Sequence, residues 1–88
     1  MQKIKVRIIT PSGIQHELEA ETVVLPGSEG EFGVMYGHAP MIVQLKAGEI
    51  RLETTNEASK SLQIKDFAAV KVSSDGVDIM SPSQVGSD

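Results

Sequence analysis

The sequence predicts an all-β protein, a single antiparallel β-sandwich or flattened barrel of short strands. Val, Ile and Thr outnumber Leu and Ala in the chain, and β-branched side chains favour the pleated surface of a sheet. Apolar and polar residues alternate over short segments that Gly- and Pro-containing turns separate, and no segment keeps the apolar period of a helix. Short strands joined by close turns are typical of sandwiches and small barrels.

The length of the chain allows one small domain. With 88 residues, of which 40% are hydrophobic, the protein can bury a single core. We expect the domain to span residues 1–80, and residues 81–88 to form a polar flexible tail. The chain has no cysteine, which excludes a disulfide framework, a thiolate metal site and a cysteine nucleophile.

The charge and composition disfavour two kinds of partner. A net charge of −4 and only one Tyr, two Phe and no Trp argue against nucleic-acid binding, which usually needs a basic stripe or a stacking platform. No apolar run approaches the roughly 20 residues that span a bilayer. Residues 1–7 alternate charged and apolar side chains and so do not resemble a signal peptide.

The first two strands have polar faces of opposite charge. Residues 3–8 alternate basic with apolar side chains, and residues 14–21 alternate acidic with core-facing side chains. The expected core-facing residues of the second strand are Ile14, His16, Leu18 and Ala20.

The pattern also predicts how these two strands pair. A three-residue loop that pairs Thr10 with Ile14, with Gly13 in a left-handed conformation, keeps both apolar faces on the core side. Arg7 then lies opposite Glu17, and in the same register Lys5 lies opposite Glu19 and Lys3 opposite Glu21. A slip of one residue would bury these charges, so we expect the register to be strongly specified.

The rest of the chain predicts further short strands separated by loops. Residues 26–31 form an acidic, turn-rich loop, and residues 32–40 contain too many Gly and Pro residues for a central strand. Turns are expected at Ala47–Gly48 and Ser74–Gly76, with a polar loop at residues 55–61. The expected strands are Val23–Leu25, Met41–Lys46, Ile50–Thr54, Leu62–Ile64, Phe67–Val72 and Val77–Ile79.

The residues do not suggest catalysis, a metal site or a cofactor. His16 is expected to be a partly buried core histidine, and His38 has no neighbouring zinc ligands. Glu29 and Glu31 lack the ligand spacing of a calcium loop, so a solvated acidic loop is the simpler interpretation. The chain has no nucleophile elbow and no phosphate-binding glycine motif.

The segment from Met35 to Met41 is the unusual feature. It presents Met, Tyr, His and Pro from one loop, and exposed loops with such side chains often contact partner proteins. The competing interpretation is that Met35 and Met41 only fill the edge of the core.

This segment and its neighbours resemble the signature of the epsilon subunit family of F-type ATP synthases. The resemblance is carried by three parts at the family's spacing: Pro26-Gly27-Ser28-Glu29-Gly30-Glu31-Phe32-Gly33, then Gly37-His38-Ala39-Pro40-Met41, then Lys46-Ala47-Gly48. The sequence departs from the family in having Tyr36 where Pro is common and Asp66-Phe67-Ala68 in place of a glycine pair. It also stops at Asp88, before the helical hairpin that usually follows the sandwich.

The resemblance implies a non-catalytic rotor subunit of the central stalk. It implies that Glu31, with Glu29 and Gly30, contacts the c-subunit ring. The implied gamma-subunit contacts are Met35, Tyr36, His38, Ala39, Pro40 and Met41. Such a subunit couples proton translocation to ATP synthesis, touches the alpha/beta catalytic head only indirectly, and lies at the cytoplasmic face of the bacterial inner membrane. Without the helical hairpin, coupling without self-inhibition is expected.

Two alternatives remain open on the sequence. One is a stand-alone β-sandwich that binds small anions through the backbone N–H groups of Gly27–Gly30. The other is the mitochondrial counterpart, called delta, which shares the fold and the rotor role; the lack of a transit peptide disfavours it.

Overall fold

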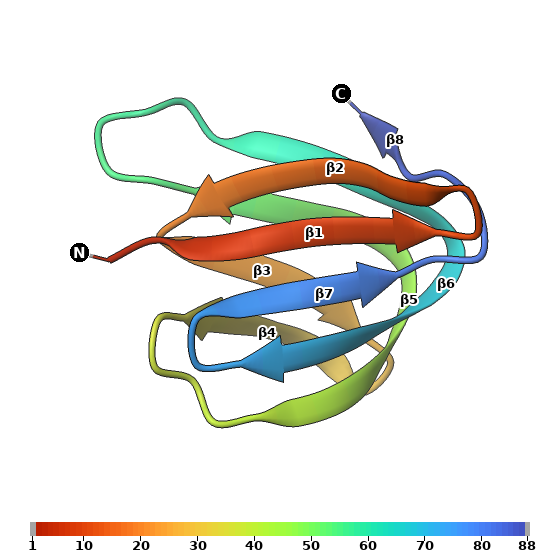
Figure 1. The fold of residues 1–88 in the computed structure, drawn as a ribbon, viewed down its shortest axis with the longest axis horizontal. Helices are drawn as coiled ribbons and strands as arrows, with labels where there is room; N and C mark the ends of the chain where they lie inside the picture. The colour runs from red at the N-terminus through yellow and green to blue at the C-terminus, as the bar shows by residue number, and fades with distance from the viewer. Residues whose placement is uncertain (1, 88) are drawn as a thin grey trace.

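The computed structural model describes residues 2–87, which form β-strands and no helix (Figure 1). The all-β prediction is therefore confirmed. The strands are β1 (Ile4–Thr10), β2 (Gly13–Ala20), β3 (Thr22–Gly27), β4 (Gly30–Met35), β5 (Met41–Glu53), β6 (Lys60–Ser73), β7 (Gly76–Met80) and β8 (Gly86–Ser87). They are hydrogen-bonded in the order β2-β1-β7-β6-β5-β3-β4, and β8 pairs with β6.

One strand pair departs from the purely antiparallel prediction. β1 and β7 run parallel, whereas all the other paired strands are antiparallel. Parallel neighbours cannot be joined by a tight turn, and here the chain passes through β2 to β6 before β7 returns beside β1. Figure 1 shows the result, with β1, β2 and β7 in one layer and β3 and β4 in the layer behind them.

β5 and β6 connect the two layers, because each is a single long strand that bends. Turns and breaks were expected within both, but β5 continues through Ala47–Gly48 and β6 continues through Lys65–Asp66. The predicted turn is instead a break in register: Lys46 pairs with Phe67, and Gly48 pairs with Ile64. A bulge of this kind bends a strand without ending it, so one strand serves both layers.

Gly48 shows why the bend needs glycine. Its φ is +154°, and a Cβ built there would lie 3.1 Å from the Cβ of Pro26 on β3. A side chain at position 48 would therefore be strained and crowded.

The β1–β2 hairpin confirms part of the predicted register. Lys5 pairs with Glu19 and Arg7 with Glu17, but Thr10 pairs with Gly13 rather than Ile14. The loop is thus two residues long, and the register shifts between Ile8 and Ile9.

This bulge reverses the faces at the end of β2. Ile8 pairs with His16 and Ile9 with Ile14, so Gln15 is the extra residue. Ile14 consequently lies on the outer face and is 54% exposed, which makes its assignment to the core wrong. His16 is half-buried, as predicted, and Leu18 packs half-buried against the core.

The core lies between the layers and is almost entirely aliphatic. β1 contributes the residues of even number, as its alternation predicted. The buried apolar residues are Ile4, Val6, Ile8, Ala20, Val23, Leu25, Val34, Leu45, Ile50, Leu52, Leu62, Ile64, Ala68, Val70, Val72, Val77, Ile79 and Val85.

Residues 81–87, the described part of the expected polar tail, are packed against the sheet. Ser81 is 6% exposed, Val85 is 4% exposed, and Gly86–Ser87 pair with β6. Val85, the apolar side chain of this polar segment, is part of the buried core. Asp88 lies outside the described residues.

Candidate functional site

The first group of candidate residues lies at the turn between β3 and β4. Gly27 pairs with Gly30, which leaves Ser28 and Glu29 as a two-residue turn. Gly30 has a φ of +134°, and a Cβ on Gly27 would lie only 2.6 Å from the carbonyl oxygen of Gly30. Both glycines are therefore required by the backbone, and the turn presents the exposed side chains of Glu29 and Glu31.

The same turn is tied to the rest of the sheet. The Ser28 N–H donates to the carbonyl of Gln44 on β5, with an N···O distance of 2.9 Å. That N–H group is therefore already bonded within the protein, which weakens the alternative of an anion nest at Gly27–Gly30.

Glu31 belongs to a cluster of charges on the outer face of β4 and β5. The Arg51 Nη1 lies 3.4 Å from Glu31 Oε2 and 3.7 Å from Glu49 Oε1, and the Arg51 Nε lies 3.7 Å from Glu53 Oε2. One guanidinium thus serves three carboxylates, and the cluster keeps a net negative charge. The side chains are exposed by 37% to 57%, so each pair contributes at most about 1 kcal/mol to stability. The sequence pattern did not identify Arg51, because only the pairing of β3 with both β4 and β5 brings it near Glu31.

The second group of candidate residues forms the loop between β4 and β5. Gly37 has a φ of +87°, and its N–H donates to the carbonyl of Ser74, 2.7 Å away in the β6–β7 turn. The His38 N–H donates to the Met35 carbonyl at 3.1 Å, and His38 Nδ1 donates to the Ala39 carbonyl at 2.7 Å. These bonds give the loop a defined shape although most of it is exposed.

The side chains of this loop divide into outward and inward groups. Met35 is 45% exposed and Tyr36 is 52% exposed, and Ala39 and Pro40 are also exposed. Met41, by contrast, is half-buried and packs against the core. The interpretation that these methionines fill the core edge therefore holds for Met41 and not for Met35.

Ile42, directly after this loop, was not among the candidate residues. It is 75% exposed on β5. Its place on the polar side of the alternation from Met41 to Lys46 was the signal that could have identified it.

The structure does not bring the two groups of candidates together. They lie at opposite ends of β4, which runs from the β3–β4 turn on one side of Figure 1 to the β4–β5 loop on the other. Five residue steps along a strand correspond to roughly 17 Å. The two groups of candidates therefore lie too far apart to form one site.

Other polar clusters of the molecule have structural partners. Arg7 donates two hydrogen bonds of 2.9 Å each to the carboxylate of Asp78 on the neighbouring strand β7. This hydrogen bonding lowers the pKa of Asp78 and raises the pKa of Arg7. Hydrogen bonds from the Thr55 hydroxyl and N–H lower the pKa of Glu21.

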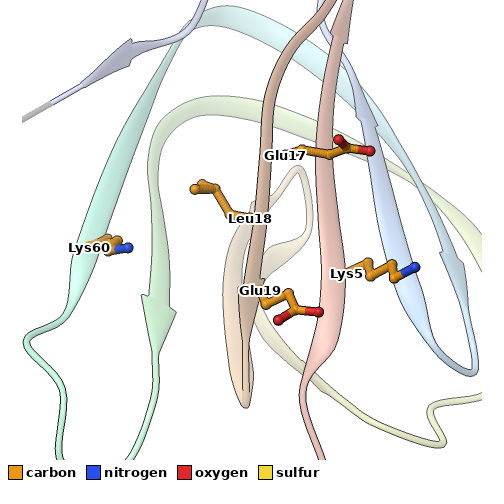
Figure 2. A pocket seen from close by; sticks show the side chains of 5 residues that line it. All are labelled: Lys5, Glu17, Leu18, Glu19 and Lys60. Carbon is orange, nitrogen blue, oxygen red and sulfur yellow. The ribbon is translucent and has the colours of Figure 1, made fainter.

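A shallow hollow of about 560 Å³ lies beside β2. It is lined by Lys5, Glu17, Leu18, Glu19 and Lys60. Figure 2 shows that the Leu18 side chain points from β2 toward the side where β6 lies, whereas Lys5 and Glu17 point away from it. The lining side chains therefore do not converge on a common point, as a substrate site would require.

Within residues 2–87, no three or more His, Cys, Asp or Glu residues are grouped so that they could hold a metal ion. No helix that could cross a membrane occurs in the part of the chain that the structure describes.

Comparison with known proteins decides the family. Residues 3–85 match the model of the ATP synthase delta/epsilon chain β-sandwich domain. The chain belongs to this family. The ATP synthase epsilon chain of Helicobacter pylori is 40% identical over 85 residues, which cover 97% of this chain and 68% of that one. The epsilon chain of Rickettsia bellii is 57% identical over 51 residues, which cover 58% of this chain and 47% of that one.

Solved structures agree with the delta/epsilon fold. A chain of the Euglena gracilis mitochondrial ATP synthase, in an assembly of OSCP, F1 and c-ring, superposes with a TM-score of 0.83 at 20% identity. A chain from the central stalk and c-ring of the Tetrahymena thermophila mitochondrial ATP synthase gives 0.72 at 16% identity. The matched parts cover 97% and 93% of this chain, and 53% and 65% of those chains.

Proposed function

We propose that the protein is a non-catalytic subunit of the central stalk of an F-type ATP synthase. In this role it clamps the gamma subunit and rests on the c-subunit ring, so that ring rotation is coupled to the alpha/beta catalytic head. The observation that supports this most is the position of the two candidate groups at opposite ends of β4. One sandwich can then hold two partners at once, and family membership supports placing both partners in an F-type ATP synthase.

The ring contact is assigned to the β3–β4 turn. Glu29, Gly30 and Glu31 are exposed there, and the Arg51 cluster leaves an excess of negative charge. Such a surface favours a partner with basic loops, mainly through orientation and the association rate.

The gamma contact is assigned to the β4–β5 loop. Met35, Tyr36, Ala39 and Pro40 are exposed, and His38 holds the loop shape through its hydrogen bonds. A loop that is already ordered loses little conformational entropy when it docks. Met41 is half-buried and packs against the core at the end of this loop.

The cellular location that we propose is that of the complex. The subunit is peripheral, is held at the membrane by its partners, and lies at the cytoplasmic face of the bacterial inner membrane. The relatives with the higher identities are bacterial epsilon chains, which supports this setting over the mitochondrial delta counterpart.

The first experiment is capture of the 88-residue chain by the gamma subunit. We expect stoichiometric capture by the parent chain and a weaker complex for His38→Asp, because this variant puts a charge on a surface that loses water on docking. Tyr36→Ser should also weaken capture through lost apolar contact. Ile14→Ser, at an exposed apolar residue on β2 outside the loop, is the matched control. Equal capture of all four chains would contradict the assignment of the loop, and absence of capture would contradict the rotor role.

A further inference from the structure

Residues 81–87 form a strap that closes one end of the sandwich. In Figure 1 the strap leaves β7, passes round the end of the molecule where β5 and β6 bend, and reaches β8. It starts with the Ser81 N–H, which donates to the Ile9 carbonyl at 2.8 Å. It finishes where Gly86 pairs with Gln63 and Ser87 with Leu62, on the outer edge of β6.

The middle of the strap is held by one side chain of β2. Gln15 Nε2 donates to the Val85 carbonyl at 3.0 Å, and the Val85 N–H donates to Gln15 Oε1 at 2.9 Å. The side-chain amide thus satisfies both backbone groups of Val85, as a paired strand would. β2 lies at the end of the strand order, so the amide reaches the strap from a strand edge that pairs with no other strand among residues 2–87.

The β-bulge in β2 accounts for the position of this amide. Gln15 is the extra residue between His16, which pairs with Ile8, and Ile14, which pairs with Ile9. A bulge re-aims the side chain of its unpaired residue. In an unbroken strand Gln15 would have shared the outer face with Glu17, whereas here it is half-buried against Val85.

Few other contacts hold the strap. Val85 is its one buried apolar residue, whereas Pro82, Ser83 and Gln84 are exposed. β8 contributes only two residue pairs. Segments with few buried apolar contacts and exposed backbone open locally at a lower free energy than the whole domain.

We infer that the strap opens as a unit, that the Gln15 amide is its latch, and that opening uncovers the edge of β6 at Leu62 and Gln63. A free strand edge can pair with another extended segment. The strap is therefore a device that keeps this edge closed in the isolated domain. This inference does not depend on the proposed rotor role.

Amide hydrogen exchange followed by mass spectrometry tests the latch. In the parent chain, we expect the strap amides to exchange faster than those of β5. Gln15→Met keeps the length of the side chain but loses both hydrogen bonds, and we expect strap exchange to rise about tenfold with β5 exchange changed far less. Gln15→Glu keeps the acceptor, loses the donor and places a carboxylate beside the Val85 carbonyl. The strap of this variant should therefore exchange at least as fast as that of Gln15→Met. Gln44→Met, the same change at an exposed position of β5, is the control and should leave strap exchange as in the parent.

Two results would overturn the inference. One is a parent strap that exchanges as slowly as β5, because it then opens only when the domain unfolds. The other is a Gln15→Met strap that exchanges as in the parent, or whose exchange rises only in step with that of β5. The parent comparison stands even if a Gln15 variant fails to fold.

Discussion

At the scale of single residues, the two ends of β4 differ in how their side chains are held. Glu31 is fixed loosely by an exposed ion pair with Arg51, whereas His38 is fixed by hydrogen bonds within its own loop. The Glu31 carboxylate can exchange ion-pair partners at a small cost in free energy. The loop around His38 has its conformation already formed before a partner docks. The acidic end therefore suits an electrostatic contact, and the loop suits a packed one.

Glu31→Lys tests the electrostatic contact. The side chain is more than half exposed, so we expect the fold to remain intact. Reversing the charge should weaken association with the ring by roughly two- to fivefold, by loss of an exposed ion pair. In a reconstituted complex, proton pumping per ATP hydrolysed should fall while hydrolysis continues. Glu57→Lys, an equal charge change in the β5–β6 loop, is the control; pumping at the parent level in both variants would refute the ring assignment.

Asp78→Asn tests the Arg7–Asp78 pair through pH. Hydrogen bonds from Arg7 lower the folded-state pKa of Asp78. The pair therefore stabilises the fold at pH values above the usual pKa range of Asp. That contribution is lost as the pH falls through the lowered pKa. The variant should melt at a lower temperature than the parent at neutral pH, and the gap should narrow in acid, below the usual pKa range of Asp. A gap of the same size at both pH values would show that the carboxylate charge is not what Arg7 stabilises.

At the scale of elements, two long bent strands organise the molecule. β5 and β6 each take part in both layers, and the bulge at Lys46–Gly48 lets β5 change direction. This placement sets the direction of the β3–β4 hairpin, because the Ser28 N–H is bonded to β5 beside the bend. The orientation of the acidic turn therefore depends on β5 as well as on the glycines of the turn.

Gly48→Ala should disturb this bend. The residue has a φ of +154°, and an added methyl group would lie 3.1 Å from the Pro26 Cβ. We expect a loss of about 1–3 kcal/mol in the free energy of unfolding, measured by urea denaturation. Gly33→Ala on β4 is the matched control, since a Cβ there meets nothing nearer than the Thr22 methyl at 3.9 Å. Equal stability of the two variants would show that β5 can bend without glycine.

At the scale of the whole molecule, one aliphatic core holds both proposed contact surfaces in a fixed relation. The same buried residues support the β3–β4 turn and the β4–β5 loop, because Leu25 and Val34 lie on the two strands of that hairpin. In the proposed rotor role, a rigid body of this kind would transmit torque between its partners without a moving part of its own. The rotor role thus requires stability of the domain more than chemistry within it.

Leu45→Ala tests this single core. Leu45 is fully buried on β5, and we expect its truncation to lower the free energy of unfolding by about 2–5 kcal/mol. Leu18→Ala, at a half-buried residue on the end strand β2, should cost clearly less. Thermal melts of both variants provide the measurement. A larger loss at Leu18 would mean that the core is centred on the β2 edge.

The candidate site was predictable to different degrees. The spacing of glycine and proline indicated the turn with Glu29 and Glu31 and the loop around His38. Glycine and proline are informative here because tight turns need their special backbone conformations. The pairing of Glu31 with Arg51 could not be predicted, since those residues meet only across β3. Met41 shows the same limit: its place beside exposed residues suggested a contact, but its side chain turns to the core.

The sequence by itself determined the local alternation, the all-β class, the charge-matched part of the first hairpin and the family, because these depend on neighbouring residues. Only the tertiary structure decided where register is lost. Bulges at Gln15 and near Gly48 shift the alternation of faces, expose Ile14, extend two strands through expected breaks and aim Gln15 at Val85. The tertiary structure alone also decided the parallel pairing of β1 with β7 and the packing of the strap. Each depends on contacts between segments far apart in the chain, which local periodicity does not encode.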